Sequence, residues 1–255
     1  MSKTAKVIVI GGKKGGVGKS TLAVNIAALL ANQGQKVSVM DCDTNRTCKT
    51  WIDYRNEYRS SLEESGKPCH IPYIKPEIKD PTQNIRADLM ECAKDYDYII
   101  IDTGGYENKA FKSAVVAADV IYIPFAPSDA DMQQIVPTLS VIKSLEDNLK
   151  ALEGEHINID VRLLLARVTH SNNQEKMEAK ELCKDLLSHA SLSSALIPER
   201  KKFKTLYGEG LGICDRKANG SKHEGSACIE LLVDEIKGNR SVELARVITK
   251  EGVDA

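Results

Sequence analysis

The sequence predicts an α/β fold, a doubly wound, mostly parallel sheet with helices on both faces. Three observations support this prediction. Short apolar runs alternate with stretches of helical periodicity along the chain, with little linker between them. The run Tyr98–Ile101 is continuously apolar, as expected for a central parallel strand that is buried on both faces. The first apolar run, Val7–Ile10, passes through a glycine-rich turn into a helical pattern, so a strand turns into a helix there.

The other elements follow in order along the chain. Four prolines between Gly66 and Pro81 forbid a helix and predict extended or loop structure. No internal repeat or low-complexity tract stands out, so we expect residues 1–255 to form a single domain. The expected elements are a helix from Ser20 to about Asn32 ended by Gly34, a strand Lys36–Met40, a helix Trp51–Glu64, a helix Ile85–Lys94, the strand Tyr98–Ile101, a helix Lys109–Ala118, a strand Val120–Pro124, a helix Asp129–Leu149, a strand Val161–Ala166 and a helix from about Gln174 to His189.

Composition limits the classes of protein that fit this chain. The net charge of −1 provides no global field toward nucleic acid or anionic lipid, so any such binding needs a local patch. No window approaches the roughly 18 uninterrupted apolar residues of a membrane span, and the N-terminus runs directly into the first strand. We therefore expect a cytoplasmic protein. The seven cysteines form no C-x-x-C pair, which indicates reduced thiols that mostly pack, unless they cluster in space around a metal or an iron–sulfur centre.

The glycine-rich turn has the pattern of a phosphate-binding loop. Glycines let the backbone aim successive N–H groups at one point, and the following helix adds its partly positive N-terminus. Lys19 would reach the β- and γ-phosphates, and the Ser20 hydroxyl would bind Mg²⁺. The usual pattern has glycine where this chain has Lys13, and a second lysine, Lys14, stands five residues before Lys19. The residues assigned to the nucleotide here are Gly15, Gly16, Val17, Gly18, Lys19, Ser20 and Thr21.

Acidic residues follow two further predicted strands. In a sheet of this type ligands bind at the carboxyl ends of the strands. Asp41 and Asp43 are two residues apart, which places both on one side of an extended segment, although they could instead cap a helix or occupy a turn. Asp102 would hold Mg²⁺ through a water, because Mg²⁺ dehydrates reluctantly. Gly104 and Gly105 would let the next loop move when a γ-phosphate is gained or lost.

These motifs together resemble the deviant Walker A signature of the ParA/MinD group of P-loop ATPases, and within it the ParA-type partition ATPases. The family usually has D-x-D-P-Q-G, whereas this chain continues from Asp43 with Thr44-Asn45-Arg46. It also has two glycines after Asp102-Thr103 where many members carry two prolines. These departures place it with divergent, plasmid-type members. The resemblance rests on Lys14–Thr21, Asp41–Asp43 with Trp51 downstream, Asp102–Gly105, Pro124–Asp131, and Ile197-Pro198 followed by basic residues.

The resemblance implies an ATPase that uses ATP and Mg²⁺ and forms a homodimer, in which two subunits sandwich two nucleotides. Lys14 would reach across to the partner's nucleotide, where it would stabilise charge in phosphoryl transfer as an arginine finger does. Lys19 and Asp43 would complete the catalytic set, with Asp43 positioning the attacking water. Asp41 would act near the Mg²⁺ held by Ser20 and Asp102. The loop from Arg167 to His170 lies where the family contacts the base, and the loop near Pro198 is a second wall.

The same resemblance implies a short family member that binds DNA. Its phosphate loop begins near residue 13, so the N-terminal helix-turn-helix of larger members is not expected. The ending Val247–Ala255 is acidic and weakly amphipathic, unlike the membrane helix of MinD, so we expect no membrane binding. A basic segment could contact DNA phosphates without reading sequence, or it could be a solvated loop. Its residues are Arg200, Lys201, Lys202 and Lys204, with Arg216, Lys217 and Lys222 as further candidates.

The function expected from these features is slow ATP hydrolysis to ADP and phosphate that drives the segregation of plasmid or chromosomal DNA. A centromere-binding adaptor of the ParB type would stimulate it, and the ATP-bound dimer would associate with the nucleoid. One alternative is an ATPase that positions a protein cargo over the nucleoid. Another is a nucleotide-gated regulatory module that hardly turns over.

Overall fold

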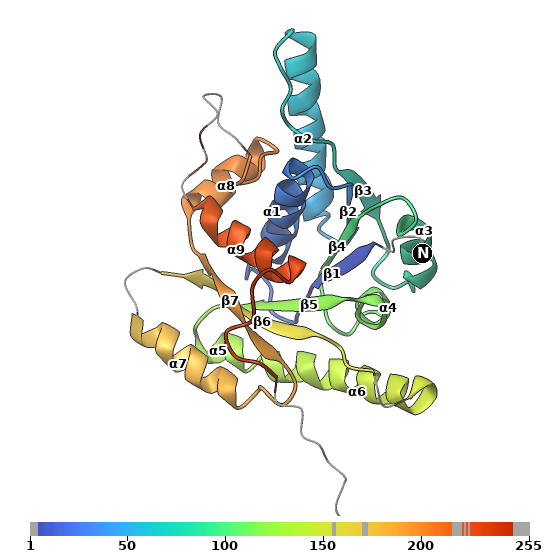
Figure 1. Cartoon of the computed structure of the whole chain (residues 1–255), viewed down its shortest axis with the longest axis vertical. Helices are drawn as coiled ribbons and strands as arrows, with labels where there is room; N and C mark the ends of the chain where they lie inside the picture. Colours follow the sequence, from blue (N-terminus) through green and yellow to red (C-terminus); the bar gives the residue numbers. More distant parts are fainter. Residues whose placement is uncertain are drawn as a thin grey trace, which may run out of the picture.

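The predicted apolar runs form the strands of one parallel sheet. The computed structural model describes residues 5–154, 157–169, 173–215, 221, 223 and 225–246. Over these residues a seven-stranded sheet runs in the order β3-β2-β4-β1-β5-β6-β7, and each pair of neighbours is parallel (Figure 1). The strands are β1 (Lys6–Ile10), β2 (Val37–Cys42), β3 (Lys75–Ile78), β4 (Tyr98–Thr103), β5 (Val120–Phe125), β6 (Val161–Val168) and β7 (Ser191–Pro198).

Helices cover both faces of this sheet, so the predicted doubly wound α/β fold is confirmed. One apolar core joins the sheet to α1, α2, α8 and α9, and a second core joins its other face to α3, α4, α5, α6 and α7 (Figure 1). The helices of the described residues are α1 (Lys19–Asn32), α2 (Thr47–Glu64), α3 (Arg86–Cys92), α4 (Lys109–Ala117), α5 (Asp129–Met132), α6 (Ile135–Glu153), α7 (Asn173–Lys184), α8 (Lys201–Gly208) and α9 (Ser226–Lys237).

Strand order determines where a ligand can bind. β1 lies near the middle of the sheet, between β4 and β5. After β1 the chain builds β2, β3 and β4 on one side, and then β5, β6 and β7 on the other. Because all of these strands are parallel, the segments that follow them meet at one edge of the sheet, where doubly wound folds bind their ligands.

Three expected elements differ from those observed. The proline-rich stretch contains β3, whose Pro76 is tolerated because β3 is an edge strand and needs N–H donors on one side only. The helix expected over 129–149 is two helices, α5 and α6, since the ring of Pro137 would clash with the carbonyl of residue 133 in a continuous helix. The helix expected to reach His189 ends at Lys184. The elements β7, α8 and α9 were not expected from the sequence, and α8 forms a helix over the basic segment that could have been a solvated loop.

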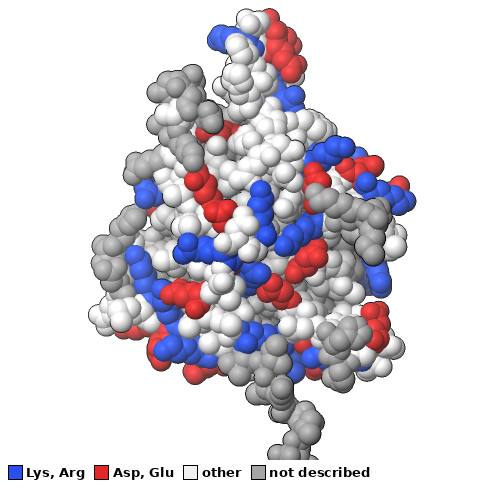
Figure 2. All heavy atoms as spheres, viewed as in Figure 1, with Lys and Arg blue, Asp and Glu red and all other residues white. Residues whose placement is uncertain are grey.

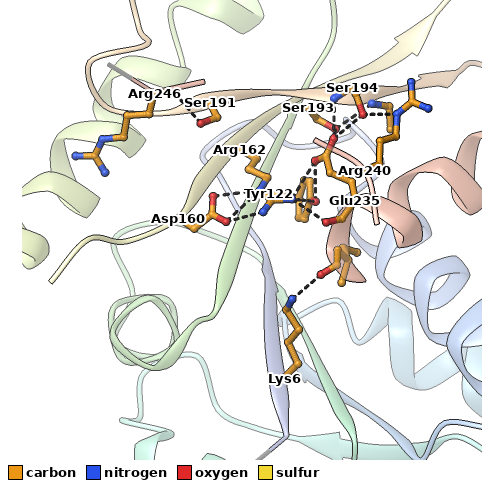
Figure 3. A network of polar contacts seen from close by, with 12 residues as sticks. Lys6, Tyr122, Asp160, Arg162, Ser191, Ser193, Ser194, Glu235, Arg240 and Arg246 are labelled. Atoms are coloured by element: carbon orange, nitrogen blue, oxygen red, sulfur yellow. Dashed lines mark hydrogen bonds and ion pairs between the residues drawn. The ribbon is translucent and has the colours of Figure 1, made fainter. Parts of the chain in front are cut away.

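A buried polar network ties α9 to the sheet on the side where the strands begin, opposite their carboxyl ends (Figure 3). At its centre is Glu235, whose side chain has no exposed surface. Its carboxylate accepts hydrogen bonds from the hydroxyl of Tyr122 at 2.9 Å and from the backbone N–H of Ser194 at 2.7 Å. Because this charge is surrounded by donors, its burial is compensated and α9 is fixed against β5 and β7. The other members drawn around it include Arg162, Asp160, Ser193, Arg240 and Lys6.

On the face that Figure 2 displays, lysine and arginine side chains are interspersed with aspartate and glutamate side chains and form no large patch of one sign. This agrees with the net charge of −1. Within the described residues, no helix has both the length and the apolar character that a bilayer crossing requires. Several residues that the sequence analysis singled out, namely His170, Arg216, Lys217, Lys222 and the segment Val247–Ala255, lie outside the described residues.

Candidate functional site

The glycine-rich turn links β1 to α1 at the carboxyl edge of the sheet. Gly16 and Gly18 have φ angles of 76° and 95°, in the left-handed region that side chains with a Cβ rarely adopt. Gly18 is the N-terminal cap of α1, so the loop leads directly into the N-terminus of this helix. Gly15 and Gly16 are exposed, and Lys13, which replaces the usual glycine, is exposed as well. The turn therefore presents backbone N–H groups at an open surface, as anion-binding loops do.

A cleft of about 610 Å³ opens beside this loop. Its volume lies in the range of roughly 300–1,000 Å³ that small-molecule sites occupy. The cleft brings together the phosphate loop, the segment after β2, the loop after β3 and the segment between β4 and α4. Its lining residues are Gly15, Gly16, Gly18, Lys19, Ser20, Thr21, Cys42, Asp43, Thr44, Asn45, Thr47, Pro81, Thr82, Gly104, Gly105 and Asn108.

Lys19 lies under the loop that it belongs to. Only 8% of the residue is exposed, and its Nζ donates to the carbonyl of Lys14 at 2.7 Å. Burial lowers the pKa of Lys19, and the nearby carboxylates of Asp102 and Asp43 oppose that shift. An ammonium group held this way is a positive charge beneath the cleft that polyphosphate would enter.

Asp102 ends β4 with a carboxylate that is poised for a cation. The residue has no exposed surface, and burial raises its pKa to about 6, with hydrogen bonding from Ser20 and Cys48 partly offsetting the shift. Oδ2 accepts a hydrogen bond from the Cys48 thiol at 3.2 Å, but the buried Oδ1 has no hydrogen-bond partner. Unpartnered buried carboxylate oxygens are unfavourable without a counter-charge. Together with the Ser20 hydroxyl, this oxygen fits a hard divalent cation.

Asp41 and Asp43 have different surroundings. Asp41 is buried in β2, and its two oxygens accept backbone N–H bonds from Asp43 and Lys49, each at 3.0 Å. Asp41 therefore makes the turn and capping contacts that its spacing allowed, and its place near Mg²⁺ stays a prediction. Asp43 is half-buried and lines the cleft, with one oxygen accepting the N–H of Asn45 at 2.9 Å. A Cβ on Gly104 would lie 2.7 Å from the Asp43 carboxyl carbon, so a side chain there would displace the Asp43 carboxylate from this position.

The departure from the family pattern at Arg46 has a local structural explanation. Arg46 caps α2 with a φ of 53°, the left-handed conformation that suits the glycine usual in the family. Its guanidinium donates to the carbonyls of Asp41 at 2.8 Å and Lys79 at 2.7 Å. These two bonds tie the ends of β2 and β3 together and offset the backbone strain.

Lys14 has an intramolecular partner in this structure. Its Nζ lies 2.8 Å from Asp131 Oδ1, with the Lys14 side chain 43% exposed and that of Asp131 7% exposed. The other oxygen of Asp131 accepts the N–H of Ala126 at 3.1 Å. The lysine precedes the cleft-lining Gly15 in the chain, and its ammonium is paired with a nearly buried acceptor.

Arg167 and the basic segment lie at the same edge. Arg167 donates to the carbonyl of Gly16 at 3.4 Å and pairs with Glu199 at 3.0 Å, so it contacts the phosphate loop. Arg200 is half-buried, and its side chain lies beside Gly225. The exposed charge of the basic segment therefore comes from the lysines of α8, which are Lys201, Lys202 and Lys204.

Sequence reasoning missed several residues of the cleft. Asn108 caps α4, as its side chain accepts the N–H of Phe111, and an asparagine before a helical run is a recognisable signal. Pro81 and Thr82 line the cleft only because the proline-rich stretch forms β3. Cys48 reaches Asp102 through tertiary contact, for which the sequence offers no signal.

Known proteins are similar to this chain in sequence and in fold. The family model described as ATPase MipZ matches residues 6–231. The chain is 28% identical to Protein ParA of Rhizobium radiobacter over 145 residues, which is 55% of this chain and 58% of that protein. It is 27% identical to maintenance of carboxysome distribution protein A of Halothiobacillus neapolitanus over 144 residues, which is 56% of this chain and 61% of that protein. The chain thus spans about three fifths of these curated relatives.

Among solved structures, an ATP complex of an McdA variant from Cyanothece has the same fold. It superposes with a TM-score of 0.67 at 18% identity, over 94% of this chain and 99% of that one.

Proposed function

The chain belongs to the ATPase MipZ family of ParA/MinD-type P-loop ATPases, which act in partition or positioning, and we propose that it is a Mg²⁺-dependent ATP hydrolase that drives DNA partition. The observation that supports this best is the unpartnered, buried oxygen of Asp102 beside Ser20, at the mouth of a glycine loop with Lys19 beneath it. A nucleotide phosphate would pair with the Lys19 ammonium and the loop N–H groups, and its cation would pair with the Asp102 oxygen.

Each candidate residue then has a defined task. The segment from Gly15 to Thr21 would bind the phosphates through its backbone, and Lys19 would neutralise their charge. Ser20 and Asp102 would hold Mg²⁺, which when bound polarises the phosphate and stabilises the charge that develops on it. Asp43, which faces the cleft, would orient the attacking water. Arg167, already on the phosphate loop, would contact the nucleotide from the side of β6.

We further propose an ATP-dependent homodimer in which Lys14 reaches the partner's nucleotide. The 43% exposure of the Lys14 side chain supports this, because the side chain can leave the surface without opening the core. To do so it must break its ion pair with Asp131. Because the Asp131 side chain is only 7% exposed, breaking the pair leaves a nearly buried carboxylate and costs more than the roughly 1 kcal/mol of a surface ion pair, so nucleotide binding and dimer contacts would have to supply that energy.

The experiment is light scattering after size exclusion, with and without Mg·ATP. We expect a dimer only with ATP, its loss in Lys14→Ala and its accumulation in Asp43→Ala, where hydrolysis stops. Asp131→Asn keeps an oxygen for the N–H of Ala126 but removes the charge that holds Lys14, so its dimer should form at lower protein concentration. A monomer throughout, or a dimer indifferent to ATP and to Lys14, would refute the sandwich mechanism.

The lysines of α8 support non-specific DNA binding by this dimer. A helix N-terminus has partial positive charge, which acidic residues in the first turn normally balance. The first turn of α8 instead has no acidic residue and carries two of the lysines. Phe203 and Leu206 are buried and anchor α8 to the core, so the lysines stay exposed around a helix N-terminus that favours anions. Phosphate groups of a nucleic acid backbone match this arrangement.

Charge reversal tests that assignment. Lys201→Glu with Lys202→Glu should weaken ATP-dependent DNA binding by at least about tenfold and reduce the salt dependence by about two phosphate contacts. Reversal of two exposed lysines elsewhere, Lys67 and Lys112, is the matched control. Equal loss in both double variants would mean a general charge effect, and retained binding in the first would place the DNA site elsewhere.

The remaining parts of the proposal concern the cellular context. We propose that residues 1–255 act as one domain in the cytoplasm, on the nucleoid when ATP is bound, with slow turnover that a centromere-binding ParB-type adaptor accelerates. The likeness to the carboxysome distribution protein and to McdA favours a second candidate, the positioning of a protein cargo. ATPase assays with each type of partner separate the two, and no stimulation by any partner would favour a regulatory module.

A further inference from the structure

A buried thiol lies directly behind the candidate cation site. Cys48 belongs to the first turn of α2 and has no exposed surface. Its Sγ lies 3.2 Å from Asp102 Oδ2 and 3.7 Å from the backbone carbonyl oxygen of Ser20. Both neighbours belong to residues that would hold the cation. A third element, α2, therefore connects the end of β4 to the start of α1 at this point.

The contact controls the orientation of the carboxylate. The last torsion of an aspartate side chain is a broad, roughly two-fold rotation, so a carboxylate without partners can turn its oxygens freely. In this structure Oδ2 is engaged by the thiol, and Oδ1 is buried without a hydrogen-bond partner. The Ser20 side chain also hydrogen-bonds this carboxylate, and the thiol contact on Oδ2 helps to fix the direction in which Oδ1 points.

We propose that Cys48 is a positioning residue for cation binding: its S–H group donates to Asp102 Oδ2 and thereby directs Oδ1 toward the divalent cation. Hydrogen bonds to metal-binding carboxylates commonly change metal affinity by 10–100-fold. The thiol is a weak donor, so an effect near the lower end of that range, about tenfold, is expected. This inference rests on the proposed function, because it concerns the cation that accompanies the nucleotide.

The alternative is that Cys48 only fills space, since it also packs in the apolar core beneath α1 and α2. Three substitutions separate the two roles. Cys48→Ser keeps a donor, Cys48→Ala removes it, and Cys48→Val removes it while filling the volume. Cys183 of α7 is the matched control, because its side chain is as buried as that of Cys48. Burial is the only cause that raises the pKa of Cys183, whereas Cys48 also has the Asp102 carboxylate beside it.

The experiment measures Mn²⁺ binding by electron paramagnetic resonance, with and without the non-hydrolysable analogue AMP-PNP. We expect Mn²⁺ affinity in the presence of AMP-PNP to fall about tenfold in Cys48→Ala and Cys48→Val. It should stay within about threefold of the wild type in Cys48→Ser, and be unchanged in Cys183→Ala. AMP-PNP affinity measured in EDTA should be unchanged in all four, because the phosphate loop itself is intact.

Each other outcome overturns the proposal in a distinguishable way. Wild-type Mn²⁺ affinity in whichever donorless variant folds would show that Cys48 only packs. A loss of AMP-PNP affinity in EDTA that matches the loss of Mn²⁺ affinity, or an equal loss in Cys183→Ala, would indicate general damage to the core. A wild-type chain that binds no Mn²⁺ with AMP-PNP would refute the proposed function itself, and Cys48 with it.

Discussion

Asp102→Asn should stabilise the ligand-free protein while removing the carboxylate that would hold the cation. Asp102 has no exposed surface, and burial raises its pKa from 3.8 to about 6, with Asp41 and Asp43 adding to the shift. A raised pKa means that the fold disfavours the ionised form of this carboxyl. Asparagine has nearly the same shape, can accept the Cys48 hydrogen bond, and brings no charge into the interior.

The size of this effect depends on pH. Each unit of pKa difference between the folded and unfolded chain corresponds to about 1.4 kcal/mol. Above pH 6 the ionised carboxylate therefore lowers the free energy of unfolding by about 3 kcal/mol. Below pH 6 the folded chain takes up the proton first, and the penalty fades as pH approaches the unfolded pKa of 3.8. Asp102→Asn should thus gain about 3 kcal/mol at pH 7.5 and about 1 kcal/mol at pH 4.5.

Urea unfolding in EDTA measures both values. The single tryptophan, Trp51, is fully buried in α2 and reports the transition by its fluorescence. Asp95→Asn at an exposed position is the control, which should change the free energy of unfolding by less than about 0.5 kcal/mol at either pH. An Asp102→Asn variant that is no more stable than the wild type at pH 7.5, or whose gain is the same at both pH values, would refute the argument.

Two further predictions concern the free energy of unfolding. Glu235→Ala should lower the free energy of unfolding by about 3–5 kcal/mol, since it leaves several buried donors and an arginine without their shared acceptor. Alanine at the exposed neighbour Asp234 should cost little. If thermal unfolding shows similar losses of stability in the two variants, the network argument is contradicted. Gly210→Ala should be far more destabilising than Gly34→Ala, because its Cβ would lie 2.1 Å from the backbone nitrogen of Arg55 while that of Gly34 meets nothing within 4 Å. Both glycines have left-handed φ angles, so about 1–2 kcal/mol is common to the two variants, and equal urea midpoints would show that α2 yields to the extra methyl.

Much of the fold was predictable from the sequence because its signals are local. The apolar runs and the glycine turn are readable within a few residues, and they led to the parallel sheet and to the position of the phosphate loop. β7 was missed because its serines break the apolar pattern, and Glu235 on α9, 41 residues from Ser194, satisfies that strand's polar groups. The break between α5 and α6 could have been anticipated from Pro137, whose ring is incompatible with the preceding turn.

The residues of the candidate site that belong to a sequence motif were predictable, whereas those that reach the site only through tertiary packing were not. Lys19, Ser20 and Asp102 meet at the carboxyl edge, as strand order requires once β1 and β4 are neighbours. Cys48 gave no signal, since a cysteine in a polar helix is ordinarily a packing residue. Nothing in the chain before folding indicates that the first turn of α2 lies against the end of β4.

The three acids of the site show why residue type alone leaves their roles open. Asp41 and Asp102 are register neighbours on adjacent strands, and both are buried, so spacing makes them equivalent. Their oxygens are not equivalent: both oxygens of Asp41 accept backbone N–H bonds, whereas Asp102 keeps one buried oxygen unpartnered. A cation would be drawn to the buried oxygen that has no hydrogen-bond donor of its own. Asp43 differs again, because only it faces the open cleft where water enters. Hydrogen bonding, more than position in the sequence, therefore supports the proposal that Asp102 would hold the cation and that Asp43 would orient the water.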